Sequence, residues 1–171
     1  KIIKKKHDEG NQIIVVVSAM SGMTNDLMSK AETISKKFNQ SELDVLVSSG
    51  EQISSSLLSG AIMELGIKSR SWMGWQIPII TDENHTSSQI IEIKTKEILK
   101  FISNKGVAVI AGFQGISLNN RITTLGRGGS DLTAVAFAKF FKTDSCEIYT
   151  DVEGVLTTDP SIHSKAKKID K

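Results

Sequence analysis

The stretch Thr124-Leu125-Gly126-Arg127-Gly128-Gly129-Ser130-Asp131 joins glycines with a guanidinium, a hydroxyl and a carboxylate. The segment 132–141 that follows is apolar except for Thr133 and Lys139. This pattern predicts a flexible loop that leads into a buried helix, with Ser130 or Asp131 as the N-cap. Glycines let backbone N–H groups approach an anion, and Arg127 adds bidentate recognition of a carboxylate or phosphate. Because Asp131 can receive an ammonium group, the loop suits a small zwitterion or a phosphorylated ligand.

Short apolar runs recur on both sides of this loop, and most are β-branched without alternation, which is typical of strands covered on both faces. Apolar residues at helical spacing lie between them, and Thr86 with Gln89 resembles a capping box before a further helix that ends near Gly106. The order predicts an α/β fold, a three-layer sandwich with a mainly parallel central sheet and helices on both faces. The expected strands are 13–17, 43–47, 77–80, 107–111 and 146–149, with a further strand or edge hairpin in 68–75, and the expected helices cover 27–38, 53–65, 86–106 and 131–141.

Clusters of small and polar residues follow several of these expected strands. Ligands of open α/β sheets gather at the carboxyl ends of the strands, so the clusters should form one cleft that the Arg127 loop covers. They are 18–24, 48–51, 112–115 and 150–154.

The composition is that of an ordinary globular domain: 171 residues, 39% hydrophobic and 23% charged. The single cysteine, Cys146, excludes an internal disulfide framework and favours a reducing compartment, and we expect it to be buried in a strand. No apolar run approaches the roughly 20 residues of a membrane span. Histidines 7, 85 and 163 show no metal-ligand spacing, and His85 is expected to be exposed in a loop. A P-loop and a Rossmann fingerprint are both absent from the sequence.

Several motifs have a functional interpretation and a plain one. The 18–24 loop can hold a phosphate or substrate at a helix N-terminus, or it is a turn with Thr24 as N-cap. Glu51 can accept a substrate ammonium group, or it is a first-turn glutamate that favours the helix dipole. Thr150 and Asp151 can bind a nucleotide or orient Mg²⁺, or they form a turn or a cap.

Taken together, these segments resemble the catalytic domain of aspartate kinases, in the amino-acid kinase superfamily. They occur in the family's order and cover most of the chain. The matching pieces are VVVSAMSGMTNDL (15–27), SSGEQISSSLL (48–58), GWQIPIITD (74–82), AGFQGI (111–116), TTLGRGGSDLTAVAFA (123–138) and IYTDVEGVLTTDP (148–160).

The resemblance implies roles for individual residues. Ser18 and Thr24 match positions that line the aspartate pocket, and Glu51 matches the glutamate that receives the substrate amino group. Arg127 matches the arginine that grips a substrate carboxylate, and Asp131 its acidic partner; these two are the implied catalytic residues. The remaining matches are Gly128, Gly129 and Ser130 on the substrate side and Thr150, Asp151, Leu156 and Ser161 on the ATP side, with no residue implied as a metal ligand.

The implied reaction transfers the γ-phosphoryl group of Mg-ATP to the side-chain carboxylate of L-aspartate. Its product is 4-phospho-L-aspartate, in the first step of aspartate-family amino-acid biosynthesis, so ATP and Mg²⁺ are the expected cofactors and the cytoplasm the expected location. At two ATP-side positions the chain departs from the family: Leu156 stands where a tyrosine is common, and Ser161 where an arginine is common.

Larger parts of the family's pattern also lack a counterpart. The N-terminal K-F-G-G-T-S segment, which supplies a phosphate-contacting lysine, and the C-terminal ACT domains are absent from the sequence. We therefore expect residues 1–171 to be a partial catalytic domain, impaired alone, that works as a homo-oligomer or with a partner chain. The alternatives are a non-catalytic, aspartate-binding or partner-dependent remnant and another relative, such as glutamate 5-kinase or uridylate kinase.

Overall fold

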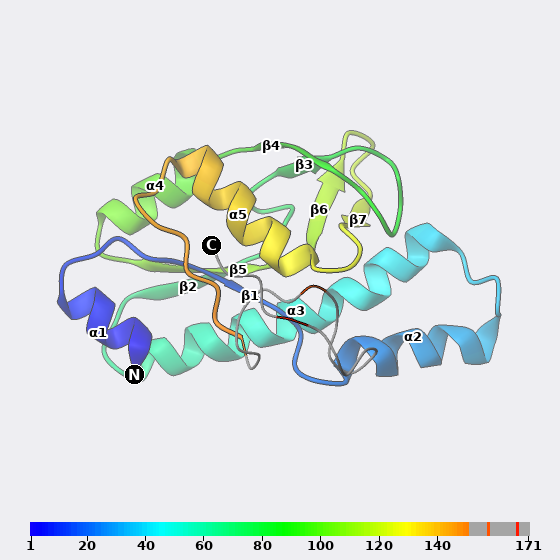
Figure 1. The fold of residues 1–171 in the computed structure, drawn as a ribbon, viewed down its shortest axis with the longest axis horizontal. Coiled ribbons are helices and arrows are strands. Elements are labelled where there is room, and N and C mark those ends of the chain that lie inside the picture. The colour runs from blue at the N-terminus through cyan, green and yellow to red at the C-terminus, as the bar shows by residue number, and fades with distance from the viewer. Residues whose placement is uncertain (151–156, 158–166, 168–171) are drawn as a thin grey trace.

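The computed structural model describes residues 1–150, 157 and 167 of the chain. In this part the helices and strands form two sheets with helices packed around them (Figure 1). The helices are α1 (Ile2–Asp8), α2 (Met23–Ile34), α3 (Gln40–Met63), α4 (Lys96–Ser103) and α5 (Gly129–Phe141). The strands are β1 (Ile14–Val17), β2 (Ser69–Trp72), β3 (Ile79–Thr81), β4 (Ile90–Ile93), β5 (Val107–Ala111), β6 (Gln114–Ser117) and β7 (Ile122–Thr124).

The first sheet is parallel and holds β1, β5 and β2 in that order. Every residue of the central strand β5 is buried, as expected for an apolar run without alternation. β1 forms one edge and is half-buried along its length, and β2 forms the other. The strands predicted at 13–17 and 107–111, and the one in 68–75, are therefore confirmed.

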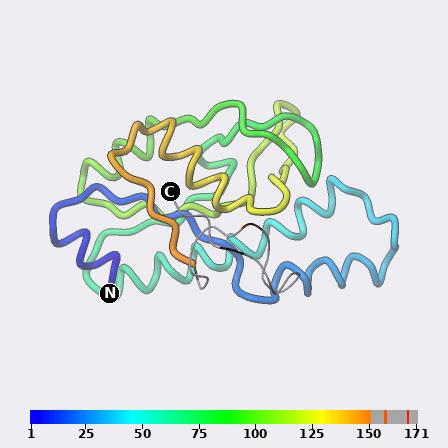
Figure 2. The backbone as a smooth tube through the Cα atoms, in the orientation of Figure 1, coloured from blue at the N-terminus to red at the C-terminus, as the bar shows by residue number. Residues whose placement is uncertain are grey.

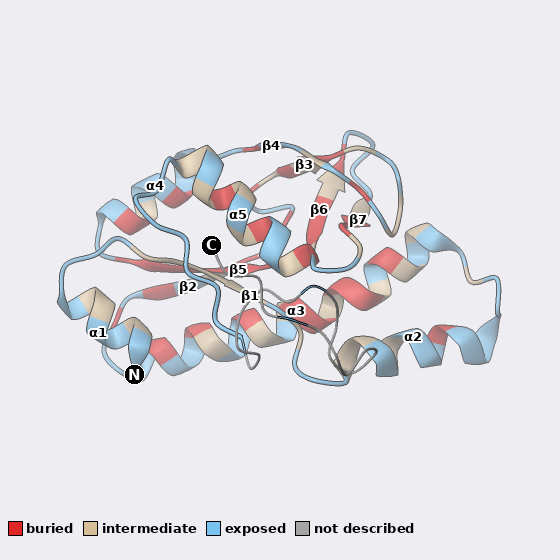
Figure 3. Ribbon diagram, viewed as in Figure 1, coloured by how far each residue is buried: buried red, intermediate tan, exposed pale blue. Residues whose placement is uncertain are grey.

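Helices cover both faces of this parallel sheet. Side chains alternate along a strand, so successive residues of β5 face different helices. Val107 and Val109 pack in a cluster with residues of α3, whereas Ala108 and Ile110 pack with residues of α4 and α5. Figure 3 shows β5 buried between helices whose outer surfaces are largely exposed. The predicted three-layer α/β arrangement is confirmed.

The second sheet is mixed, with the strand order β4-β3-β6-β7. β3 and β6 are parallel, whereas β4 is antiparallel to β3 and β7 to β6. Ile79 and Ile93 of this sheet join the same core as α4 and α5. Only the strand at 77–80 was predicted here. The short strands β6 and β7 contain no apolar run, and the residues of β4 were predicted as part of the helix at 86–106.

The strand predicted at 43–47 is wrong, because these residues lie inside α3. The side chain of Asn39 caps this helix by accepting hydrogen bonds from the backbone N–H groups of Ser41 (2.9 Å) and Glu42 (3.2 Å). Buried positions then recur at helical spacing along the whole element. They are Asp44, Val47, Ser48, Gly50, Glu51, Ser55, Ser59 and Ile62. The helical period outweighs the β-branched run, and residues 48–51 lie in mid-helix rather than after a strand.

The capping box predicted at Thr86 and Gln89 is also wrong. Thr86 lies in a loop with a φ of 67°, and the chain forms β4 before α4 begins. Asp82 holds this loop together, since its Oδ1 accepts hydrogen bonds from the N–H groups of Asn84 (3.2 Å) and Gln89 (3.1 Å). The predicted helix is therefore reduced to its second half.

The strand predicted at 146–149 is not formed. Residues 142–150 contain neither helix nor strand and are exposed throughout, and no strand in the described part of the chain pairs with them. Cys146, expected to be buried, is exposed for the same reason.

α2 lies antiparallel to the beginning of α3 and extends away from both sheets (Figure 2). Ala31 is the one buried residue of α2, so most of the surface of this helix faces solvent. Within the described residues, no helix combines the length and the apolar character needed to cross a membrane.

Candidate active site

The end of β5 meets the start of α5 through close backbone contacts. The N–H of Leu125 donates to the carbonyl of Phe113 (2.9 Å), just after β5. A Cβ on Gly112 would lie 2.8 Å from Ser130 Oγ, so glycine is needed for the hydroxyl to approach this closely. The corner after β5 and the Arg127 loop (residues 125–128) therefore lie together, as predicted for the carboxyl edge of the sheet.

Glu51 is buried within α3, with 4% of its surface exposed. Its Oε1 accepts a hydrogen bond from the N–H of Ala19 (3.0 Å), in the loop after β1. Its Oε2 is buried as well and has no hydrogen-bond partner among the described residues. Burial raises the pKa of the Glu51 carboxyl, because the charged form loses its hydration. The interpretation as a first-turn glutamate is wrong, and the unpartnered oxygen is suited to a ligand ammonium group.

Gln114 connects α3 to the corner after β5. Its side chain is wholly buried, and its Nε2 donates to the carbonyl of Ser48 (3.0 Å). A Cβ on Gly50 would lie 2.8 Å from that of Ala19, so the loop after β1 rests directly on the same stretch of helix. The loops after β1 and β5 and residues 48–51 thus converge, although residues 48–51 come from a helix.

Arg127 lies on the surface of the loop that bears it. Gly126 and Gly128 on either side have φ values of 76° and 68°, in the left-handed region that glycine adopts without strain. The guanidinium of Arg127 is exposed and makes no hydrogen bond or ion pair with any residue that the structure describes. It is therefore available to a carboxylate or phosphate.

The N-cap of α5 is Gly128, not Ser130 or Asp131 as predicted, and those two residues lie in the first turn. Glycine has no side chain to accept a hydrogen bond, so the N–H groups of this first turn have no side-chain cap. α2 is similar: its N-cap is Gly22, with a φ of 80°, and Thr24, predicted as the cap, lies half-buried within the first turn. Both helix N-termini thus keep backbone N–H groups for an anion.

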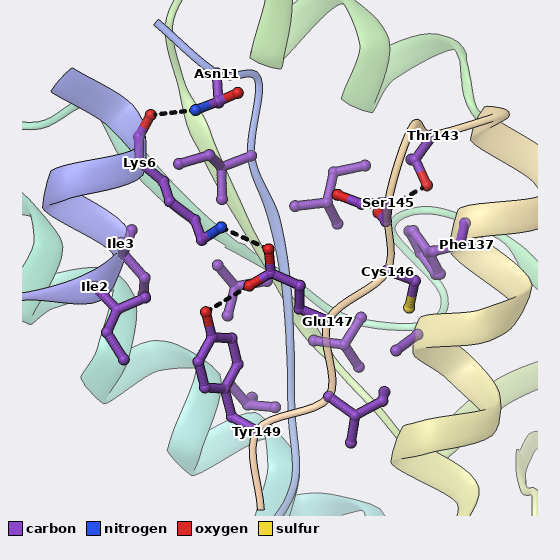
Figure 4. Close-up of a pocket in the computed structure, with 18 of the residues that line it drawn as sticks. Ile2, Ile3, Lys6, Asn11, Phe137, Thr143, Ser145, Cys146, Glu147 and Tyr149 are labelled. Carbon is purple, nitrogen blue, oxygen red and sulfur yellow. Dashed lines mark hydrogen bonds and ion pairs between the residues drawn. The ribbon is translucent and has the colours of Figure 1, made fainter. Parts of the chain in front are cut away.

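An open trough runs along β1 between α1 and α5, and residues 142–149 lie along it (Figure 4). Ser18, Ser130 and Asp131 line its wall. A smaller hollow beside it is lined by Ser18, Asp131, Ile148, Tyr149 and Thr150. The structure therefore brings together one part of the predicted site from β1, α5 and the segment before residue 151.

Glu51 and Arg127 do not line this trough in the described part of the chain. Glu51 is joined to it through Ala19, next to Ser18, and Arg127 precedes the glycines that lead to Ser130. The ATP-side predictions at Asp151, Leu156 and Ser161 lie outside the described residues. Among the described residues, no cluster of His, Cys, Asp and Glu could hold a metal ion.

Sequence reasoning missed Asp44, which is wholly buried in α3. Its Oδ2 lies 2.6 Å from Nδ1 of His85, whose side chain is 21% exposed. The prediction that His85 lies in a loop is confirmed, but the prediction that it is exposed is wrong, because it packs towards this carboxylate. The sequence did contain one signal for this site, because Asp44 is a carboxylate inside the apolar run 43–47. A carboxylate is buried in such a run only when it has hydrogen-bond or ionic partners.

Comparison with known proteins agrees with this geometry. The family described as "Amino acid kinase family" matches residues 1–171. The chain belongs to this family. The chain is 49% identical to the aspartokinase of Rickettsia conorii over 171 residues, which are 98% of the chain and 43% of that protein. It is also 49% identical to an aspartate kinase of Stutzerimonas stutzeri over 169 residues, which are 99% of the chain and 41% of that protein.

Solved structures agree with the fold of this chain. The aspartate kinase from Synechocystis superimposes with a TM-score of 0.78 at 42% identity, over 97% of this chain and 27% of that one. Aspartokinase III from E. coli, in complex with aspartate and ADP, gives a TM-score of 0.78 at 24% identity, over 98% and 50% of the two chains. The chain thus spans less than half of the length of the curated relatives described above.

Proposed function

We propose that this amino acid kinase transfers the γ-phosphoryl group of ATP to the side-chain carboxylate of L-aspartate, giving 4-phospho-L-aspartate. The similarity to aspartokinases supports this substrate, as does the complex of the E. coli enzyme with aspartate and ADP. The single observation that carries the proposal is Glu51, a buried carboxylate with one oxygen left unpartnered. Such a group is costly to bury and is best explained by a cationic ligand group that pairs with it.

The proposal gives the substrate two opposite points of attachment. Glu51 receives the ammonium group, and Arg127 grips a carboxylate in a bidentate contact. Ser18, in the loop after β1, and Thr24, in the first turn of α2, line the pocket. On the other side, next to Gly128 and Gly129, the first turn of α5 has no side-chain cap, so the N–H groups of Ser130 and Asp131 offer further donors to the anionic end.

The reacting groups are both anionic, so the protein must mainly position them and offset their repulsion. One oxygen of the substrate's side-chain carboxylate forms a bond to the γ-phosphorus while the bond from phosphorus to the β,γ-bridging oxygen breaks, and ADP leaves. Arg127 and the positive end of the α5 dipole stabilise the charge that spreads over the phosphoryl oxygens. Mg²⁺, bound with the nucleotide, would neutralise phosphate charge.

The remaining predicted roles belong to the same proposal. Asp131, in the hollow with Thr150, acts as the acidic partner near the transferred group. Asp151, Leu156 and Ser161 belong to the ATP side. Action as a homo-oligomer or with a partner chain, and a cytoplasmic location, stay predictions.

Calorimetric titration of the chain with L-aspartate tests the substrate assignment. We expect binding by the parent, and an Arg127→Ala variant that folds normally but loses affinity by about a hundredfold or more, as for a desolvated charge contact. Arg121→Ala, which removes an exposed arginine from the turn between β6 and β7, is the matched control and should bind like the parent. Equal affinity of the parent and Arg127→Ala would contradict the assignment.

A coupled assay of ADP release tests the reaction separately. The assay compares L-aspartate, L-glutamate and uridylate with Mg-ATP. Release that depends on L-aspartate supports the proposed kinase, and release with one of the other two would favour another relative of the family. Aspartate binding without ADP release or nucleotide binding would instead favour a non-catalytic aspartate-binding module.

A further inference from the structure

We propose that Asp44 and His85 are positioning residues that hold the Arg127 loop against α3 and thereby set its placement relative to Glu51. This inference rests on the proposed function for its ligand, but the geometry that it describes stands without a ligand. The anchor consists of Asp44 on α3, His85 and Thr86 in the loop between β3 and β4, and Thr124 at the end of β7.

Asp44 collects its hydrogen bonds entirely from outside its own helix. Oδ1 accepts from the hydroxyl of Thr124 (2.5 Å) and the N–H of Thr86 (3.0 Å), which also lies 3.1 Å from Oδ2. Oδ2 also lies 2.6 Å from Nδ1 of His85. An ionised carboxylate can only accept hydrogen bonds, so Nδ1 carries the proton in this contact. No lysine or arginine in the described part of the chain forms an ion pair with Asp44.

The groups that Asp44 binds lead directly to Arg127. Thr124 is followed by Leu125, Gly126 and Arg127, and its carbonyl accepts the N–H of Ser88 (2.9 Å). A Cβ on Gly126 would lie 3.2 Å from the carbonyl oxygen of Thr86, so the two loops are in close contact. Thr86 itself has a φ of 67°, which is unfavourable for a β-branched residue and is held here by the bonds to Asp44.

The same helix carries the other end of the proposed substrate grip. Asp44 and Glu51 are both buried in α3 and lie about two helical turns apart, on one face. One rigid element therefore fixes the carboxylate that receives the ammonium group and the anchor of the loop that bears Arg127. A buried carboxylate is seldom the most stabilising choice for such a position, and its directional bonds instead specify one loop geometry.

The test compares His85→Ala, His85→Asn and Asp44→Asn with Glu42→Gln. The amide nitrogen of asparagine can occupy the place of Nδ1 of histidine, so His85→Asn should restore the bond that His85→Ala removes. Glu42 also links α3 to the β6–β7 turn, through Arg121 (2.5 Å), but the pair is exposed and lies outside the anchor. Glu42→Gln thus removes the negative charge from a contact between α3 and the same sheet while leaving Asp44 and its partners in place.

Hydrogen exchange of backbone amides reports on the loop without any ligand. The amides of Leu125 and Gly129 are hydrogen-bonded in the structure (2.9 and 3.1 Å), and the amide of Ala108, bonded to Ile13 (3.2 Å), is an internal reference in the core. We expect about tenfold faster exchange at Leu125 and Gly129 in His85→Ala, since a bond to a charged group is lost, with Ala108 unchanged. His85→Asn and Glu42→Gln should exchange like the parent.

Calorimetry with L-aspartate then tests the consequence for the substrate. Affinity should fall about tenfold in His85→Ala, and further in Asp44→Asn if that variant folds. His85→Asn should recover most of the loss. Unchanged exchange at Leu125 and Gly129 in His85→Ala overturns the inference. If the parent binds aspartate, equal affinity of the parent and all of its variants overturns it as well. If the parent does not bind aspartate, the proposed function fails, while the exchange measurement still decides whether the anchor holds the loop.

Discussion

Two regions beside the parallel sheet are held together in different ways: the α3 side, and the trough along the edge strand β1. On the α3 side, Asp44, Glu51 and Gln114 are buried and use directional hydrogen bonds to join the helix to surrounding loops. On the trough side, residues 142–150 are exposed, and the pair Lys6–Glu147 at the surface ties them to α1 (Figure 4). An unmade buried bond is expensive, whereas an exposed ion pair contributes little. The residues proposed to bind the amino-acid substrate are therefore held in one geometry by buried hydrogen bonds, whereas the segment along the trough is not.

The largest effect should come from Glu51→Gln, on the α3 side. Leaving a ligand ammonium group without its buried partner typically costs about 2–5 kcal/mol, so calorimetry should detect little or no aspartate binding. The amide still accepts the N–H of Ala19 and cannot ionise. The variant should therefore unfold at the same temperature as the parent or slightly higher. Parent-like affinity would remove the main observation behind the proposed function.

The pH dependence of the same pair of proteins follows from the raised pKa of Glu51. Because the folded-state pKa is raised, this carboxyl adds its full contribution to the stability of the fold below its ordinary pKa of about 4.3. That contribution is lost as the pH rises through the folded-state pKa. The unfolding temperature of Glu51→Gln, relative to that of the parent, should thus be higher at neutral pH than at acid pH. Aspartate affinity of the parent should show the opposite trend and weaken as the pH falls through the raised pKa, because the ammonium group needs the ionised form.

A smaller loss is expected from Gly129→Ala, at the junction of the Arg127 loop and α5. The new Cβ would lie 2.5 Å from Cδ2 of Phe113 and 3.2 Å from both its Cα and the Cβ of Leu125. The ring and the backbone must both shift, which typically costs about 1–3 kcal/mol of unfolding free energy in a packed site. Denaturant unfolding measures this cost. Gly128→Ala is the control, with nothing within 4 Å of its Cβ, so it isolates the strain of a φ of 68°.

Much of the parallel sheet could be predicted from the sequence because its signals are local. Residues 107–111 form an unbroken apolar run, and β5 is wholly buried. The glycines around Arg127 require a loop, and an apolar segment after it requires a covered helix. The resemblance to aspartate kinases added the grouping of Ser18, Ser130 and Asp131, which the structure brings together along the trough.

The parts that failed depend on contacts distant in the chain. Residues 43–47 look like a strand until Asn39 is seen as a cap and Asp44 as a buried group, because the apolar run alone does not distinguish the two periods. The partners of Asp44 lie in another loop and another strand, and no spacing in the sequence reveals them. Residues 146–149 have the composition of a strand, but in the described part of the chain they pair with no other strand.

A modest gain in stability is expected from Gly60→Ala, which tests whether α3 is a rigid element independent of the site. Gly60 is exposed within the helix, and a Cβ at this position would have nothing within 4 Å of it. Alanine should stabilise the helix by roughly 0.5–1 kcal/mol because glycine loses more backbone entropy on folding. Thermal unfolding measures the gain, and aspartate affinity should not change. Gly66→Ala, just after α3 with a φ of 74°, is the control and should destabilise instead.

The smallest effect is expected on the trough side, from Glu147→Gln. Lys6 Nζ lies 2.6 Å from Glu147 Oε1, but the two side chains are 38% and 46% exposed. The hydrogen bond from Lys6 lowers the pKa of Glu147, so any stability that the carboxylate provides is present above its ordinary pKa and disappears as the pH falls through the lowered value. Salt weakens the attraction between Lys6 and Glu147 further, since the electrostatic screening length shrinks from about 10 Å at 0.1 M to about 3 Å at 1 M.

We therefore expect Glu147→Gln and the parent to unfold at the same temperature at neutral pH, in low and in high salt, and to bind aspartate equally. The hydroxyl of Tyr149, which donates to Glu147 Oε2 (2.6 Å), can still donate to the amide oxygen of the variant. A clear loss of stability at low salt that vanishes at high salt would mean that this ion pair holds residues 142–150 as firmly as buried bonds hold the α3 side. In that case the proposed contrast would be wrong, because the segment along the trough would be held as firmly as the residues proposed to bind the substrate.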